Sequence, residues 1–252
     1  MTADDAATEY LLRLGDNCLI LGHRLSEWVG HAPVLEEDLG LANVALDLLG
    51  QAQHWLGLAA ELEGEGRDAD WFAFRRDAGE FRNALLVEQP NGDFAHTMAR
   101  QLYFDLWHVP LLANLENSMH AGIAGIAAKA HKEARYHLER SGDWVIRLGD
   151  GTEESHRRMQ EAINELWNFT GELFESDAVE EVLAAEGVAA DAGRIAASWR
   201  KRLGDILTEA TLDLPQENWM RHGGRRGIHS EHLGFLLAEM QFLQRAYPDA
   251  RW

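Results

Sequence analysis

Residues 46–52 read LDLLGQA and residues 132–138 read KEARYHL, and these two stretches are the strongest indication of the architecture. Each places a carboxylate, Asp47 or Glu133, within a long segment whose apolar residues recur at helical spacing. Each carboxylate has a counterpart on the preceding segment, Asp16 for Asp47 and Asp105 for Glu133. The two pairs span similar lengths of sequence around a turn. The chain therefore predicts two helical hairpins with an acidic pair midway along each, and the pairs can face each other across a bundle.

This arrangement is the carboxylate frame of a four-helix bundle that binds two metals. In ferritin-like bundles of that kind, two helices contribute one Glu each and the other two contribute Glu-x-x-His. Here Gly50 stands three residues after Asp47, and Tyr136 stands three residues after Glu133. Glycine has no donor atom, and a phenol is an uncommon substitute for imidazole. We therefore predict an all-α, ferritin-like bundle in which the frame is vestigial and binds no metal.

Two interpretations of the frame remain open from the residues alone. In the first, the acids bridge two metals with His108 and His137 as nitrogen donors, and His23 or His54 could assist. In the second, they form a buried polar network with basic side chains, histidines and water. The candidate bases are Arg13, Arg24, Arg100, Lys129 and Arg135. We favour the network, because spacing on long helices often matches a metal motif by chance.

The rest of the chain also reads as helix. We predict four long helices over about 4–29, 37–62, 93–117 and 122–148, with a short helix over 71–84. A further amphipathic helix should run along Met159, Ile163, Leu166, Thr170 and Leu173. The last two should cover 191–211 and 230–247, the latter with Ser230 as its N-cap. We expect one domain over 1–252, with a core bundle over about 4–149 and extra helices over about 152–247.

The composition of the chain argues against several classes of partner and site. The formal net charge is −19, which disfavours nucleic acid and anionic membranes as partners. The single Cys18 excludes an internal disulfide and a cysteine-rich zinc site. The acidic N-terminus does not resemble a signal peptide, and no apolar run is long enough to span a bilayer. A cytoplasmic protein is expected.

One loop differs from the acidic background. Residues 220–229 read MRHGGRRGIH and contain Arg221, Arg225 and Arg226 with three glycines. Glycines ahead of a helix can let main-chain N–H groups approach an anion, such as a coenzyme A phosphate. Contact with a partner protein or with another part of the chain is the interpretation we favour, since the loop has no Walker-type spacing. An exposed loop that offsets local acidity is the simplest alternative.

Several stretches resemble one family. They are RLGDNC at 13–18, EWVGHAP at 27–33, LDLLGQA at 46–52, LVEQPNG at 86–92, KEARYHL at 132–138 and EHLG at 231–234. Together they look like the structural subunits of bacterial phenylacetyl-CoA 1,2-epoxidases, and the resemblance covers nearly the whole chain.

The resemblance implies a ferritin-like, non-catalytic subunit of a multicomponent monooxygenase in aerobic phenylacetate catabolism. A related catalytic subunit would hold the di-iron centre and the substrate, and this chain would scaffold it. A reductase subunit would supply electrons from NADPH through flavin and iron–sulfur groups. The expected partners are therefore the catalytic subunit and the other epoxidase subunits, with no cofactor in this chain.

The sequence and the resemblance leave three candidate functions. The first is the scaffold, with apolar anchors such as Trp55, Trp107 and Trp167 in a large interface. The second is an active di-metal oxygenase built on the acidic frame with His108 and His137. The third, compatible with the first, is recognition of acyl-CoA by the arginine-rich loop.

Overall fold

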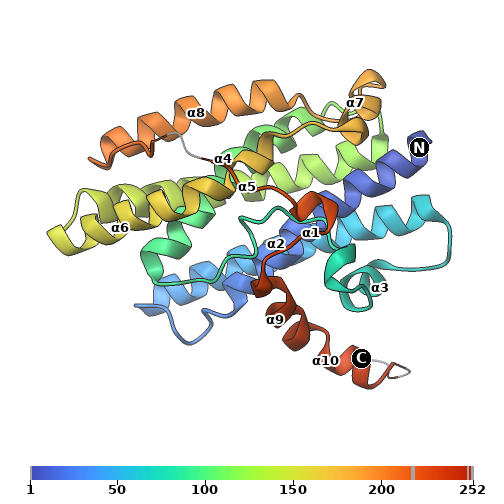
Figure 1. Cartoon of the computed structure of the whole chain (residues 1–252), viewed down its shortest axis with the longest axis horizontal. Helices are drawn as coiled ribbons and strands as arrows, with labels where there is room; N and C mark the ends of the chain where they lie inside the picture. The colour runs from blue at the N-terminus through green and yellow to red at the C-terminus, as the bar shows by residue number, and fades with distance from the viewer. Residues whose placement is uncertain (1, 217–218, 249, 251–252) are drawn as a thin grey trace. The chain divides into compact units, whose positions relative to one another are not determined.

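A computed structural model describes residues 2–216, 219–248 and 250. The chain divides into two units, which are described separately. Figure 1 shows the helices, coloured from the N-terminus to the C-terminus. Unit 1 comprises Met1–Pro90 and His222–Trp252, and unit 2 comprises Asn91–Arg221. Within the described residues all regular structure is helical, so the all-α prediction is confirmed.

Unit 1 is built on the hairpin of α1 (Ala3–Ser26) and α2 (Leu35–Glu63). Thr2 caps α1 through a reciprocal capping box with Asp5, and the acidic side chains of the first turn oppose the positive end of the helix dipole. The two helices approach closely at Gly22, where an added Cβ would lie 3.2 Å from the carbonyl oxygen of Ala45. Gly64 ends α2 in the left-handed conformation.

Short elements complete unit 1. They are α3 (Ala69–Phe74), η1 (Ala78–Glu80), η4 (Gly224–Arg226), α9 (Glu231–Met240) and α10 (Phe242–Ala246). The helix predicted over 71–84 is wrong beyond Phe74, because the largely exposed turn η1 follows and the chain then enters a buried loop from Phe81 onward. The helix predicted over 230–247 is interrupted at Gln241, whose side-chain Nε2 donates to the carbonyls of Ala73 and Arg76.

Unit 2 contains the second hairpin, α4 (Phe94–Leu115) and α5 (Ala121–Gly149), with α6 (Glu153–Leu166) and α8 (Ala192–Glu209) packed against it. The amphipathic line predicted to continue through Thr170 and Leu173 is wrong beyond Leu166, where the 3₁₀ turns η2 (Trp167–Phe169) and η3 (Gly171–Phe174) follow. The short helix α7 (Ala178–Ala185) was not predicted.

Each unit contains one hairpin of two long helices, which is the element from which a ferritin-like bundle is built. The bounds of these helices agree with the four predicted long helices within about three residues, which is the usual uncertainty at helix ends. Among the described residues, no helix combines the length and apolarity needed to cross a membrane.

Candidate functional site: two buried carboxylate clusters

Asp16 lies near the middle of α1 and is completely buried. Both of its carboxylate oxygens accept hydrogen bonds from the guanidinium of Arg76: Nη1 lies 3.0 Å from Oδ2, and Nη2 bonds Oδ1. The main-chain N–H of Arg82 donates to Oδ2 at 2.8 Å. A bidentate arginine pair of this kind uses the oxygen lone pairs that a metal ion would need.

Arg76 is itself fixed by unit 1. Its Nε donates to the carbonyl of Phe72 at 2.6 Å, and its Nη1 donates to the carbonyl of Glu80 at 3.0 Å. Its guanidinium carbon lies 4.3 Å from the centre of the Phe81 ring. These contacts, together with those to Asp16, replace the water that the guanidinium of Arg76 loses on burial. The cation can therefore lie in the interior beside Asp16.

The loop over 84–89 is buried without forming a regular helix. A buried loop requires partners for its main-chain groups. The N–H of Ala84 donates to Oδ1 of Asn17 at 2.9 Å, and the carbonyl of Glu88 accepts Nε and Nη2 of Arg24 at 3.2 and 2.8 Å. Polar residues of α1 therefore position this loop.

The side chain of Glu88 joins the same loop to the segment before α9. Its Oε2 lies 2.8 Å from Nδ1 of His229 and accepts Nδ2 of Asn83 at 3.0 Å, while Oε1 accepts the N–H of Ser230 at 2.6 Å. Ser230 occupies the predicted N-cap position of α9, but its side chain makes no cap hydrogen bond.

This arrangement favours the charged form of His229. Its Nε2 lies 3.0 Å from the carbonyl of Phe81, so both ring nitrogens face acceptors. Burial lowers the pKa of His229, but the hydrogen bond and charge of Glu88, the Phe81 carbonyl and the charge of Asp16 outweigh burial and raise the pKa above 6.5.

The second acid of the first hairpin, Asp47, is half-buried on α2. Gly50, one turn further along, is also half-buried, and a Cβ added there would meet nothing within 4 Å. Steric crowding therefore does not explain the absence of an imidazole at this position.

In unit 2, Asp105 lies on α4 and is completely buried. Its Oδ1 accepts Nε2 of Gln101 at 2.7 Å, and its Oδ2 accepts Oγ of Ser141 at 2.8 Å. Burial raises the pKa of Asp105 from 3.8 to about 6, against the charge of His137, the hydrogen bonds of Ser141 and Gln101, and the charge of Arg140.

The two histidines proposed as nitrogen donors are both buried. His108 packs against Phe104, with ring centres 4.8 Å apart, and stacks on Trp107. Burial, together with the charges of His137 and His131, lowers the pKa of His108 to about 3, so its ring is neutral at physiological pH. His108 therefore behaves as a packed aromatic ring.

Glu133 is half-buried, and Tyr136 is 56% exposed on α5. The residue of α5 that hydrogen-bonds Asp105 is Ser141, about two turns from Glu133. The position where a metal-binding bundle would present its second imidazole thus carries a surface phenol.

These donors do not fit a di-iron centre. The oxygens of Asp16 are bound by Arg76, those of Asp105 are bound by neutral donors, and Gly50 and Tyr136 supply no imidazole. In the part of the chain that the structure describes, no three His, Cys, Asp or Glu side chains cluster closely enough to hold a metal ion. Because the two acidic pairs belong to different units, their facing one another stays a prediction.

The arginine-rich loop also crosses the boundary between the units. In unit 2, the N–H of Arg221 donates to the carbonyl of Asn168 at 2.8 Å, and its guanidinium lies over the Phe169 ring. In unit 1, Arg225 is half-buried and Arg226 is exposed. Gly227 has a φ of 75°, and a Cβ there would lie 2.1 Å from the carbonyl oxygen of Gly79. Chain packing therefore accounts for this glycine, and the anion or partner contact of the three arginines stays a prediction.

Exposed leucines form an apolar stripe on α2. Leu35, Leu39 and Leu46 are 71%, 57% and 66% exposed, and their spacing places them on one face of the helix. The tryptophans proposed as interface anchors are different: Trp55 is 0% and Trp107 8% exposed, so both belong to the core. The prediction of those two as surface anchors was wrong, because α2 and α4 use their aromatic residues for internal packing.

Sequence reasoning missed Arg76, Gln101, Ser141 and His229 as partners of buried acids. Gln101 stands four residues before Asp105, a spacing at which helical side chains meet, and this signal could have found it. Arg76 and His229 lie far in sequence from Asp16 and Glu88, and no spacing rule connects them.

Comparison with known proteins agrees with the predicted resemblance. The family described as "Phenylacetic acid catabolic protein" matches residues 1–252. The chain is also similar to a protein of Escherichia coli (strain K12) whose name describes it as one of the subunits of 1,2-phenylacetyl-CoA epoxidase. The two are 56% identical over 245 residues, which cover 97% of this chain and 98% of the relative.

Proposed function

The chain belongs to the family of phenylacetic acid catabolic proteins, and from that premise we propose that it is a subunit of a phenylacetyl-CoA epoxidase. More specifically, we propose the non-catalytic, structural subunit of a multicomponent di-iron monooxygenase. The di-iron centre and the substrate then belong to a catalytic partner, and NADPH, flavin and iron–sulfur groups belong to a reductase subunit.

The observation that carries the non-catalytic role is the pairing of Asp16 with Arg76. A guanidinium fixed against both oxygens of a would-be ligand competes with any cation for that site, and its positive charge repels a second one. The neutral bonds to Asp105 support the same proposal, since they occupy both of its oxygens.

Metal content and turnover test this role. After anaerobic iron loading and gel filtration, the chain alone should retain well below one iron and show no epoxidation, and turnover should require the catalytic subunit. Near two irons per chain, with activity lost in Asp105→Ala, would instead establish this chain as an oxygenase.

The α2 stripe supports a scaffolding role and gives the catalytic subunit a place to bind. A cluster of large exposed apolar side chains on one helix face is a typical core of a permanent interface. Leu39→Gln/Leu46→Gln should weaken the complex with the catalytic subunit by about tenfold or more, with little change in the chain's own stability because both side chains are exposed.

Leu214→Gln is the matched control, because Leu214 is similarly exposed (58%) but lies in unit 2, outside this stripe. It should leave the affinity for the catalytic subunit unchanged. Equal loss in both variants, or none in the double variant, would remove the stripe from the interface.

A further inference from the structure

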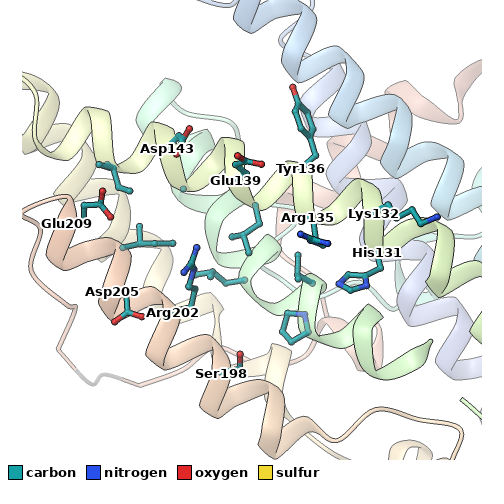
Figure 2. Close-up of a pocket in the computed structure, with 17 residues that line it drawn as sticks. His131, Lys132, Arg135, Tyr136, Glu139, Asp143, Ser198, Arg202, Asp205 and Glu209 are labelled. Carbon is teal, nitrogen blue, oxygen red and sulfur yellow. The ribbon is translucent and has the colours of Figure 1, made fainter. Parts of the chain in front are cut away.

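Helices α4, α5 and α8 of unit 2 line an open groove with a volume of about 980 Å³ (Figure 2). Its apolar lining includes Leu106, Val109 and Pro110 of α4 and Ile206 of α8. Gly142 of α5 faces α8, since a Cβ there would lie in ordinary van der Waals contact, 3.6 Å from Cδ1 of Ile206. The groove shares no residue with the α2 stripe or with the buried acids.

Charges along the groove are separated by sign. On α5, Lys132 and Arg135 are followed by Glu139 and Asp143, and on α8, Arg202 is followed by Asp205 and Glu209. Figure 2 shows Lys132 and Arg135 toward one end and Asp205 and Glu209 toward the other, with Arg202 reaching up between the helices. The groove therefore has a basic end and an acidic end above an apolar floor.

These charges have no partners among the residues that the structure describes. The seven side chains are all exposed, and within the described residues none of them forms a hydrogen bond or an ion pair. On α6, by contrast, Arg157 pairs with both Glu154 and Glu161. The groove charges are available to an external surface whose signs run in the opposite direction.

We propose that this groove is a self-association surface, occupied by the groove face of a second copy of this chain related by a two-fold axis. A half-turn places the basic end of one copy against the acidic end of the other, so a polarised surface is complementary to itself. The α8 ridge of each copy then fills the other's groove, and Gly204, beside which no atom lies within 4 Å of an added Cβ, leaves room for that approach.

Other occupants match the groove less well. A small anion at Lys132, Arg135 and Arg202 would leave four carboxylates unpaired beside it, and nucleic acid would be repelled by them. The formal net charge of −19 opposes pairing of two copies in general, so association requires local complementarity of this kind.

Charge reversal in the full-length chain tests the proposal by sedimentation velocity over a concentration series. The wild-type chain should form a dimer. Arg135→Glu/Arg202→Glu and Asp205→Lys/Glu209→Lys should each weaken that dimer by about tenfold or more, because each substitution acts twice across a two-fold interface. An equimolar mixture of the two variants should associate again.

The decisive variant carries all four substitutions. It reverses the sign at four of the seven charged positions, leaves Lys132, Glu139 and Asp143 unchanged and keeps the net charge at −19. Because each reversed base can again meet a reversed acid across the two-fold axis, it should dimerise more tightly than either double variant. Arg200→Glu/Glu186→Arg is the matched control: it is also charge-neutral, both residues are exposed, and neither lines the groove. It should dimerise like wild type.

A wild-type chain that stays monomeric to about 100 μM would overturn the proposal, as would a folded four-fold variant that does not self-associate. So would a dimer that only Leu39→Gln/Leu46→Gln abolishes. Loss of catalytic-subunit binding in the charge variants, with unchanged self-association, would assign the groove to that subunit instead. The proposal does not rest on the epoxidase role, since the assay requires neither substrate nor partner.

Discussion

Asp16 in unit 1 and Asp105 in unit 2 occupy similar places on the first helices of their hairpins, and both are completely buried. Their partners differ in kind. Asp16 is bound by the guanidinium of Arg76, whereas Asp105 accepts hydrogen bonds from the neutral side chains of Gln101 and Ser141. Glu88, the other buried carboxylate described in unit 1, resembles Asp16 in having a basic partner, His229.

The difference shows two ways in which a bundle can retain a metal-type carboxylate without its metal. Arginine supplies a permanent positive charge and also ties distant segments to the carboxylate, here the turn around Glu80. Neutral donors supply no charge, so burial raises the pKa of Asp105 and favours its protonated form. Unit 1 therefore depends on ion pairs, and unit 2 tolerates a carboxylate that can become neutral.

The largest expected effect comes from removing the arginine. Arg76→Met should destabilise the chain by about 3–5 kcal/mol, because it leaves Asp16 buried and charged without its partner. Asp16→Asn/Arg76→Met should recover much of that loss, and urea unfolding of the single and double variants measures the coupling.

Arg75→Met is the matched control on the neighbouring residue. The Nη2 of Arg75 bonds the carbonyl of Pro248 at an exposed site, so its loss should change stability by no more than about 0.5 kcal/mol. If the double variant were as unstable as Arg76→Met, the charge pair would not explain the effect, and the contrast with Asp105 would lose its basis.

The next effect separates the two acids by pH. The folded-state pKa of Asp105 is raised from 3.8 to about 6, so wild type should be stabilised by protonation at low pH and lose about 3 kcal/mol as pH rises through that interval. The stability of Asp105→Asn relative to wild type should therefore increase by about that amount between about pH 4 and pH 7.

Ser141→Ala sharpens this test. It removes a hydrogen bond that lowers the pKa of Asp105, so the loss of stability should extend to higher pH than in wild type. Urea unfolding across the pH series measures both curves. A difference in stability between Asp105→Asn and wild type that does not vary with pH would show that burial does not raise the pKa of Asp105.

The long helices and two of the buried acids could be predicted from the sequence, whereas the bounds of the short elements could not. Apolar residues at helical spacing on 4–62 and 93–148 predicted both hairpins, because long amphipathic helices are determined locally. The same pattern predicted all four acids of the frame in the interior: Asp16 and Asp105 are buried, whereas Asp47 and Glu133 are only half-buried. The short elements were harder: α7 has too few turns to show a period, and the break at Gln241 depends on carbonyls more than 160 residues away in the sequence.

The basic partners of Asp16 and Glu88 could not be predicted from local spacing. Arg76 reaches Asp16 across 60 residues, and His229 reaches Glu88 across 141. The arginines that we proposed as partners lie on the long helices, nearer in sequence to the acids. Arg76, the actual partner of Asp16, instead follows α3, in a segment that was predicted to be a single short helix. Identifying such a pair requires the tertiary arrangement, since only the loop over 75–90 brings the two charges together.

The last and smallest effect tests whether Glu88 depends on a charged partner, as Asp16 does, or needs only neutral donors, as Asp105 does. Because the folded-state pKa of His229 is raised above 6.5, its contribution should be complete below that pH and decline as pH rises through the folded-state pKa. His229→Gln should thus cost about 2 kcal/mol near pH 6 and less near pH 9, measured by urea unfolding. His232→Gln is the control, since the contact of His232 with Arg24 uses its main-chain carbonyl. If the cost of His229→Gln stays constant with pH, a neutral imidazole suffices, Glu88 is held as Asp105 is, and charge no longer distinguishes the two units.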